Sequence, residues 1–275
     1  MPKSPGDHRD RLAALGGAGD DAVGLGETGF LLAGLCRPQA RVADYLDYRD
    51  GLAAELAPAP SDAAGRAATL AELMAGRQRF RGDDCDDEQV ANANLMWVVD
   101  HRQGVRSALA ILYLDVARAA GWRADGLNLP GALLVRLEDG AGQRVILDPF
   151  ERGRIVGAPD LRALVKSSSG SAAELEPAYF TPAGNRDMLV RLQNDIKLRL
   201  LRRGLVERAL AVVEAVLLFA PGQAQLWREC GLMQLRLGDP RAAAASLEQF
   251  VARTANPGAR RRTLQLLQDI RLRLL

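Results

Sequence analysis

The sequence is poor in the residues on which most metal sites and disulfide frameworks depend. Among its 275 residues only two are histidine, His8 and His101, and only three are cysteine, Cys36, Cys85 and Cys230. Two histidines are too few for a histidine-based metal site. Because the cysteines lie far apart and show no C-x-x-C spacing, they predict neither a zinc cluster nor a set of disulfides. We therefore expect no metal, no cofactor and a reducing compartment.

Long apolar runs are also missing. The run over residues 30–35 is too short to span a bilayer, and the first 19 residues contain scattered charges without the apolar core of a signal peptide. These two observations predict a cytoplasmic protein that does not enter a membrane.

Lysine is scarce, since only three of the 36 basic residues are lysine, and the charge is unevenly distributed. Residues 186–275 have a net charge of +8 and residues 1–185 a net charge of −6. Two regions of opposite sign suggest two domains. The polar run 166–171, followed by Pro177 and Pro182, is interpreted as the loop between them. We expect a flexible segment over 1–24, a first domain over 25–185 and a second over 186–275.

The first domain is predicted to be α+β. Apolar residues at helical spacing predict helices over 27–36, 40–56, 61–78, 88–100 and 106–120. The period then changes, and short strands are expected over 127–129, 132–137 and 144–148, the last two joined by the turn-rich residues 138–142. Helices followed by an antiparallel sheet that packs on one of them form an α+β layout.

The second region contains a repeat. Gly204 and Gly238 lie 34 residues apart, and so do Ala209 and Ala243, which is the tetratricopeptide period. We expect two repeats and a closing helix near 258–275. Because about three repeats are needed for independent stability, the region is expected to dock on the first domain through an apolar seam of Leu198, Leu201, Leu205 and their neighbours.

The order of motifs in the chain resembles the SirB1 family of transglutaminase-like proteins. The resemblance covers about residues 25–275 and rests on several groups of residues: Arg102 and Gly104, Leu109 to Ala117, Asn128-Leu129-Pro130-Gly131, Asp148-Pro149-Phe150, and Arg228 to Leu232. It implies a papain/transglutaminase-like core followed by an all-α tail of tetratricopeptide-type repeats. The biochemical activity of that family is poorly defined.

The resemblance implies a triad whose first two members are missing. A transglutaminase-type site has a cysteine at the start of the central helix, a histidine on the next strand and an aspartate on the strand after it. In this chain the matching positions hold Arg106, Ala132 and Asp148. A guanidinium replaces neither a thiolate nor a proton acceptor, so this is a vestigial triad and we expect no catalytic residue there.

Two roles are open for each of the charged members. Because Asp148 precedes Pro149, a structural role in a turn is the favoured interpretation of this residue. For Arg106 the favoured interpretation is a side chain that extends into solvent. Alternatively, Asp148 pairs with Arg106 and refills the vacated site, although a cation at a helix start opposes the helix dipole. In that case Arg106 and Asp148 are possible ligand contacts.

The remaining candidates favour structural interpretations. Cys85 lies among Asp83, Asp84, Asp86 and Asp87, which disfavour its thiolate; helix capping explains these carboxylates better than a calcium site. Cys36 and Cys230 are expected to be small core residues. His101 is expected to stabilise a helix end.

Basic patches at 197–203 and 260–262 are the last candidates. Aromatic residues make up only 5% of the chain, so a stacking surface for single-stranded nucleic acid is not expected. A solvated helix face that meets the acidic first domain is the favoured interpretation, and nucleic-acid binding is unlikely on this reasoning.

The sequence therefore predicts a catalytically inactive transglutaminase-like protein that acts as an interaction or regulatory scaffold, with an unknown protein or peptide bound by the repeats. The alternative is a hydrolase or another enzyme that uses a non-standard residue set in the same cleft. The oligomeric state stays open.

Overall fold

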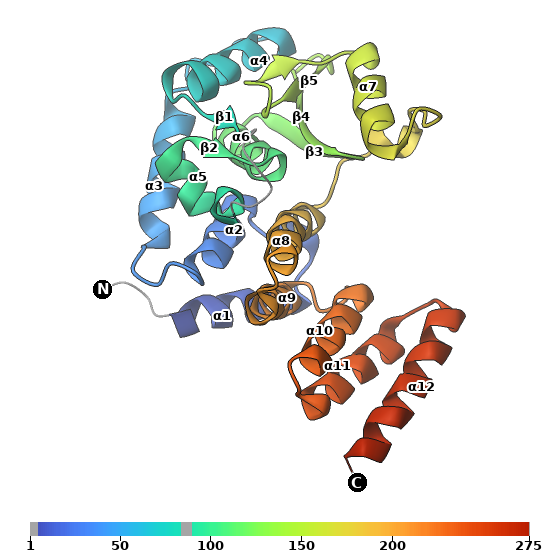
Figure 1. The fold of residues 1–275 in the computed structure, drawn as a ribbon. Coiled ribbons are helices and arrows are strands. Elements are labelled where there is room, and N and C mark those ends of the chain that lie inside the picture. Colours follow the sequence, from blue (N-terminus) through green and yellow to red (C-terminus); the bar gives the residue numbers. More distant parts are fainter. Residues whose placement is uncertain (1–4, 84–89, 275) are drawn as a thin grey trace.

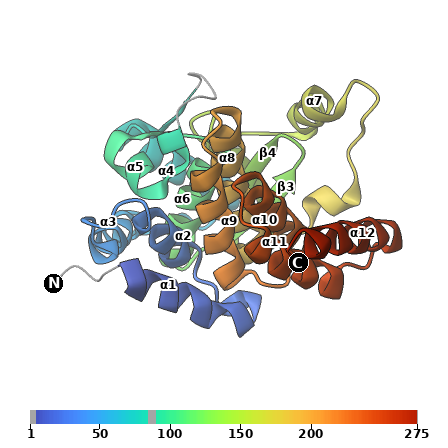
Figure 2. The ribbon, with the colours of Figure 1, turned by 60° about the horizontal axis from the view of Figure 1, so that its bottom comes forward.

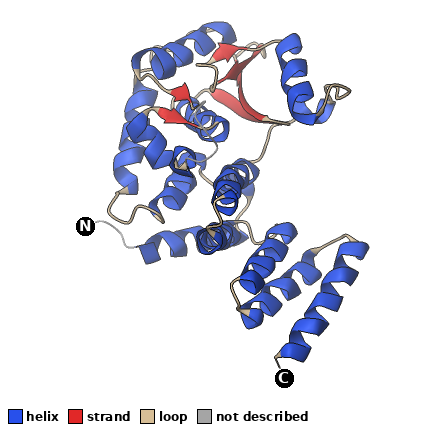
Figure 3. Ribbon diagram, viewed as in Figure 1, coloured by secondary structure: helices blue, strands red, loops and turns tan. Residues whose placement is uncertain are grey.

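The chain forms a mixed helix and sheet domain followed by a row of helices (Figures 1 and 3). The computed structural model describes residues 5–83 and 90–274. In the first domain the helices are α1 Pro5–Ala14, α2 Leu25–Gly34, α3 Val42–Ala54, α4 Ala63–Ala71, which continues as a π-helical turn over Glu72–Arg77, α5 Leu95–His101, α6 Arg106–Ala119 and α7 Ala158–Ser169. The predicted α+β core followed by helical repeats is confirmed.

Helix α6 is the centre of this domain. Every residue from Ser107 to Ala117 is buried, because the sheet covers one side of the helix and α2, α3, α5 and α8 cover the others. The helix ends just before Gly121, whose φ of +75° suits a residue without a side chain. An almost wholly apolar helix is what such a central position requires.

The main sheet has four antiparallel strands in the order β3 Arg123–Leu129, β4 Ala132–Glu138, β5 Arg144–Asp148 and β6 Arg154–Ile155. Alternation along β4 directs Leu133 and Val135 into the core that contains α6, and Ala132 and Leu134 into a second apolar cluster that includes residues of α7. The sequence did not predict α7. The polar run 166–171 is therefore only partly a loop, because its first residues form the last turn of that helix.

A second, very small sheet pairs β1 Arg81–Gly82 with β2 Gln103–Gly104 in parallel. Two residues per strand leave no alternating pattern in the sequence, so this pair was not predicted. It holds the start of α6 beside the segment that follows the π-helical turn.

The N-terminal segment differs from the flexible extension that was expected. Its helix α1 buries His8 and Leu12, and Val23 is fully buried just beyond it. Helix α1 lies beside α9 (Figure 1), and the carboxylate of Asp20 accepts hydrogen bonds from the backbone N–H groups that start α8, at 2.7 Å for Asn185. Scattered charges concealed these few apolar contacts in the sequence.

The tail consists of α8 Asn185–Arg202, α9 Val206–Phe219, α10 Ala224–Arg236, α11 Pro240–Arg253 and α12 Pro257–Arg273. Gly204 and Gly238, the two repeat glycines, follow α8 and α10 with φ of +70° and +82°. Gly231 is needed at the α10–α11 crossing, because an added Cβ would lie 2.7 Å from the Leu247 side chain. The period of 34 residues thus corresponds to successive helix pairs.

The tail contacts the first domain through α8 and α9, whereas α10, α11 and α12 extend away from the sheet (Figures 1 and 2). The residues that join the first-domain core are Met188, Leu189 and Leu192 on α8, with Val216 and Phe219 on α9. The expected seam was misplaced, since Leu198 is 42% exposed and Leu201 and Leu205 pack within the tail instead.

Candidate functional site

Arg106 is the first residue of α6, at the position that the resemblance assigns to a nucleophile. Its Nη1 lies 2.8 Å from Oδ2 of Asp148 and its Nη2 lies 3.5 Å from Oε1 of Glu151. The guanidinium carbon lies 4.2 Å from the ring centroid of Phe150. The expectation that Arg106 extends into solvent is therefore wrong, because its side chain is 29% exposed and held on three sides.

Asp148 ends β5 and combines the two roles that were left open for it. Its side chain is only 2% exposed. One carboxylate oxygen accepts from Arg106, and the other accepts a 3.0 Å hydrogen bond from the backbone N–H of Phe150, which fixes the turn after Pro149. A cation at a helix start is unfavourable, and the negative side chains of Asp148 and Glu151 beside Arg106 offset this cost.

Ala132 does not join this pair. It starts β4, is fully buried, and belongs to the aliphatic cluster between the sheet and α7. In the antiparallel register of β4 and β5, Val135 lies opposite Leu147. One residue further along, Leu134 and not Ala132 therefore lies opposite Asp148. The structure thus brings together two of the three positions that the resemblance assigns to a triad, and the third lies in apolar packing.

Ser107 follows Arg106 and was not identified from the sequence. Its hydroxyl donates a 2.5 Å hydrogen bond to Oδ2 of Asp195 on α8, and the residue is 1% exposed. From the same face of α8, Arg191 donates to the carbonyl of Leu129 on β3 at 3.0 Å, and burial lowers the pKa of Arg191. Ser107 thus ties the central helix to the tail, and its burial denies a substrate access to its hydroxyl.

Both histidines are committed elsewhere. His8 lies against Gly34, where an added Cβ would come 2.8 Å from its ring. His101 ends α5, stacks on Trp97 with ring centroids 4.0 Å apart, and has its Nδ1 2.9 Å from the Trp97 carbonyl oxygen. The helix-end position expected for His101 is therefore what the structure has.

The described cysteines are Cys36 and Cys230, and both are free thiols. Cys230 is a core residue as expected, and burial raises the pKa of its thiol. Cys36 is exposed, contrary to expectation. Cys85 and its neighbours Asp84, Asp86 and Asp87 lie outside the described residues. Within residues 5–83 and 90–274 no cluster of three or more metal-binding side chains occurs.

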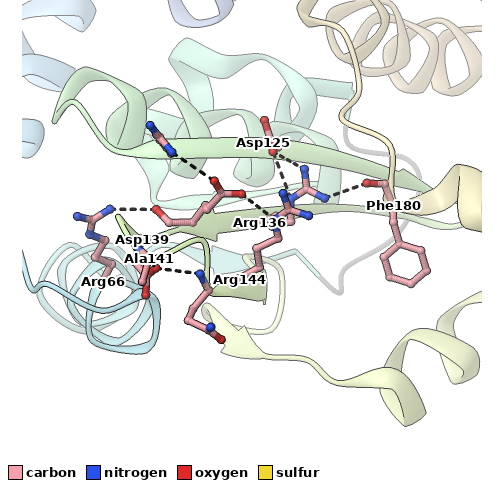
Figure 4. A network of polar contacts seen from close by, with 10 residues as sticks. Arg66, Asp125, Arg136, Asp139, Ala141, Arg144 and Phe180 are labelled. Atoms are coloured by element: carbon pink, nitrogen blue, oxygen red, sulfur yellow. Dashed lines mark hydrogen bonds and ion pairs between the residues drawn. The ribbon is translucent and has the colours of Figure 1, made fainter.

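A polar network crosses the β3–β4 pair at the sheet (Figure 4). Arg136 is 7% exposed, lies 2.5 Å from a carboxylate oxygen of Asp125, and donates to the carbonyl of Phe180. Asp139 accepts hydrogen bonds from three backbone N–H groups: Gln143, Ala141 and Ala63. These bonds, that from Gln143 foremost, lower the pKa of Asp139. The network has protein partners throughout and serves the fold.

The basic patch 197–203 is not simply a solvated face. Lys197 is 6% exposed, and its Nζ lies 2.5 Å from Oε2 of Glu229 on α10. This pair joins the first repeat to the second. In the part of the chain that the structure describes, no helix has both the length and the apolar character needed to cross a membrane.

Comparison with known proteins agrees with this arrangement. Residues 41–194 match the transglutaminase-like superfamily, and residues 196–268 match a tetratricopeptide repeat. A UPF0162 protein of Pseudomonas aeruginosa is 28% identical over 94% of this chain and 96% of its own length. A UPF0162 protein of Xylella fastidiosa is 31% identical over 58% of both chains. Protein SirB1 of Salmonella typhimurium is 27% identical over 56% of this chain and 57% of its own length.

The last two matches thus span less than two thirds of the relatives' lengths, whereas the first spans nearly the whole of both chains. The resemblance to the SirB1 family is confirmed. Since the first family match covers more than half of the residues, the chain belongs to the transglutaminase-like superfamily, and a tetratricopeptide repeat region follows its transglutaminase-like domain.

Proposed function

We propose that this protein is a catalytically inactive member of its superfamily that acts in the cytoplasm as a scaffold for a protein or peptide partner. The observation that carries the proposal is the ion pair between Arg106 and Asp148 at the start of the central helix. It occupies the position from which a nucleophile would act.

The chemistry of the surrounding residues supports inactivity. Acyl transfer needs a nucleophile and a proton acceptor beside it. An arginine stays protonated at all physiological pH values and serves as neither. Ser107 is the nearest hydroxyl along the helix, but it is buried and donates to Asp195. His101 is the histidine nearest to Arg106 along the chain, but its imidazole stacks on Trp97 and does not serve as a base at the helix start.

The tail supports the binding half of the proposal. Tetratricopeptide-type repeats stack helix pairs into extended surfaces that proteins use to bind peptides and partner helices. Here α10 to α12 extend away from the first domain, and Leu264 and Leu272 on α12 are 49% and 65% exposed. Apolar side chains exposed on a repeat face suit a partner better than they suit solvent.

An activity measurement tests the first half. The full chain is incubated with a glutamine peptide and a fluorescent primary amine, and separately with p-nitrophenyl esters, before and after iodoacetamide treatment. We expect turnover no faster than that of buffer. Turnover that iodoacetamide abolishes, and that the Cys36→Ser variant lacks, would show that a thiol in this fold is catalytic and would overturn the proposal.

Hydrogen exchange tests the second half. A partner captured from native lysate by the full chain is purified and added back, and amide protection is mapped along the sequence. Protection is expected on helices of the tail, over residues 186–273. A partner that protects only the first domain would contradict binding by the repeats.

A further inference from the structure

A cavity of about 520 Å³ lies where the tail meets the first domain. Its walls come from α2, from α5 and the turn before it, and from α8 and α9. Its volume falls within the range of sites that hold a small ligand or a large side chain, and domain junctions are where such sites concentrate. It is distinct from the position of Arg106 and Asp148, which do not line it.

The burial of the lining residues shows which part of the cavity is deep. The buried ones are apolar, among them Leu32, Leu95 and Val212, with a single polar exception. That exception is Gln193 on α8, which is 7% exposed. Its amide makes no hydrogen bond to any residue in the ranges 5–83 and 90–274, and it is not among the side-chain groups there that are sealed from solvent without a partner, so it is open to the cavity. A ligand that enters the cavity displaces water from this amide, so binding is favourable only if the ligand supplies a hydrogen bond in its place.

The charged side chains that line the cavity are all basic. Arg9 on α1 and Arg208 on α9 are exposed and form no ion pair with any described residue, and Arg37 just after α2 is half-buried. Arg37 is held by Asp100 at 2.7 Å. The described lining residues include no aspartate or glutamate. The cavity thus has an apolar interior, one hydrogen-bonding group at depth and a cationic rim.

We propose that this junction cavity binds an acidic peptide segment of a partner protein, which inserts a tyrosine side chain. The proposal rests on the scaffold function and names the chemistry of its partner. A tyrosine has an apolar ring with a polar tip, so the ring would lie against the aliphatic walls while its hydroxyl meets the amide of Gln193. Carboxylates on both sides of the tyrosine would meet Arg9 and Arg208, which come from helices far apart in the sequence.

Fluorescein-labelled peptides of the form Asp-Glu-Gly-X-Gly-Glu-Asp provide the probe, with X varied over all residue types and binding to the full chain measured by anisotropy. We expect tyrosine to bind best. Replacing it by phenylalanine is expected to weaken binding about two- to twelvefold, the net value of one hydrogen bond. In Gln193→Leu the tyrosine peptide should bind no better than the phenylalanine peptide, because the hydroxyl no longer has the amide as a hydrogen-bond partner.

The rim is tested with Arg9→Gln and Arg208→Gln, each expected to weaken binding about threefold, and with Arg241→Gln as an exposed control outside the cavity, expected to change nothing. Exposed Cys36 also lines the cavity. A bound tyrosine peptide should slow its alkylation by iodoacetamide, as followed by mass spectrometry at that residue.

Gln193→Leu also separates a binding role from a structural one. If the amide has no partner within the protein, the leucine should leave the midpoint of thermal unfolding unchanged or raise it. A lowered midpoint would show that Gln193 supports the fold and would overturn its assignment as a ligand contact.

Three further results would overturn the proposal. These are no binding of any peptide up to about 1 mM, a leucine peptide that binds as well as the tyrosine peptide, or binding that survives all three cavity variants. If decanoate protects Cys36 from alkylation and none of the peptides does, the cavity is a lipid site and not a peptide site. If a native partner nevertheless protects amides of α10 to α12 alone, the protein is a scaffold whose partner does not bind in this cavity.

Discussion

Replacing Arg106 by alanine tests whether the first residue of α6 has a structural role through its ion pair with Asp148. The substitution removes the cation from Asp148, whose side chain is 2% exposed. Within residues 5–83 and 90–274 the carboxylate then keeps the backbone N–H of Phe150 as its hydrogen-bond donor. An arginine that merely extended into solvent would cost less than about 0.5 kcal/mol to remove. The two interpretations of Arg106 therefore differ in a measurable quantity.

The expected loss of unfolding free energy is about 2–3 kcal/mol. A charge-assisted hydrogen bond contributes about 1.5–3 kcal/mol, and breaking a fully buried ion pair costs about 3–5 kcal/mol. Because the Arg106 side chain is 29% exposed, water can replace part of what the guanidinium provides, and the value falls at the lower end. The ring contact with Phe150 is lost as well.

Urea unfolding followed by far-ultraviolet circular dichroism measures this loss of unfolding free energy. Arg41→Ala is the control, because Arg41 is 58% exposed and its ion pair within residues 5–83 and 90–274 is with nearby Asp44. The unfolding free energy lost in this variant should stay below about 0.5 kcal/mol. The double variant with Asp148→Asn should lose less than the sum of the single changes. A loss for Arg106→Ala as small as that of the control would refute a structural role for the ion pair between Arg106 and Asp148.

Three other outcomes are expected. Arg106→Cys combined with Ala132→His should show an ordinary thiol pKa near ~8.5 in the pH dependence of iodoacetamide alkylation, because position 132 faces the α7 cluster and not the helix start; a much lower value would contradict this geometry. Asp139→Asn should destabilise at neutral pH, and the difference from wild type should disappear in urea melts as pH falls through the lowered pKa of Asp139; a pH-independent difference would exclude that carboxylate as the cause. Calorimetry of the full chain should show one unfolding transition. Its midpoint temperature should fall only modestly in ~0.15 M salt, which screens charges beyond about 8 Å. Two transitions whose midpoints match those of separate fragments divided near residue 185 would show that the tail folds independently.

The sequence was most informative where local periodicity and glycine position decide the structure. The hairpin over 138–142 followed from its turn residues, and Gly142 indeed has a φ of +81°. Gly204 and Gly238 marked the helix pairs of the tail by their spacing alone. In each case the signal lies within a few residues of the feature, or repeats at a fixed period.

The sequence was least informative where the structure depends on contacts between distant segments. Helix α1 is stable here because α9, some 200 residues further along, covers it, and nothing local predicts that contact. The same holds for Gln193, which a helical pattern cannot distinguish from a solvent-facing residue. Leu198 shows the converse error, since a leucine in an amphipathic pattern was placed in a seam but is exposed.

The first turn of α6 connects these observations. Arg106 extends toward the edge of the sheet and pairs with Asp148, while the next residue, Ser107, bonds to Asp195 on the first tail helix. Two successive residues at the start of the central helix thus hold both the sheet and the tail. In a catalytic relative of this fold that turn must stay open to a substrate, because the nucleophile acts there. Here contacts to the sheet and to the tail close the same turn from two sides. A cysteine at position 106 would remove the cation beside Asp148, and the hydrogen bond from Ser107 would still hold the tail against the helix start. The first turn of α6 thus couples the edge of the sheet to the docked repeats through two adjacent side chains.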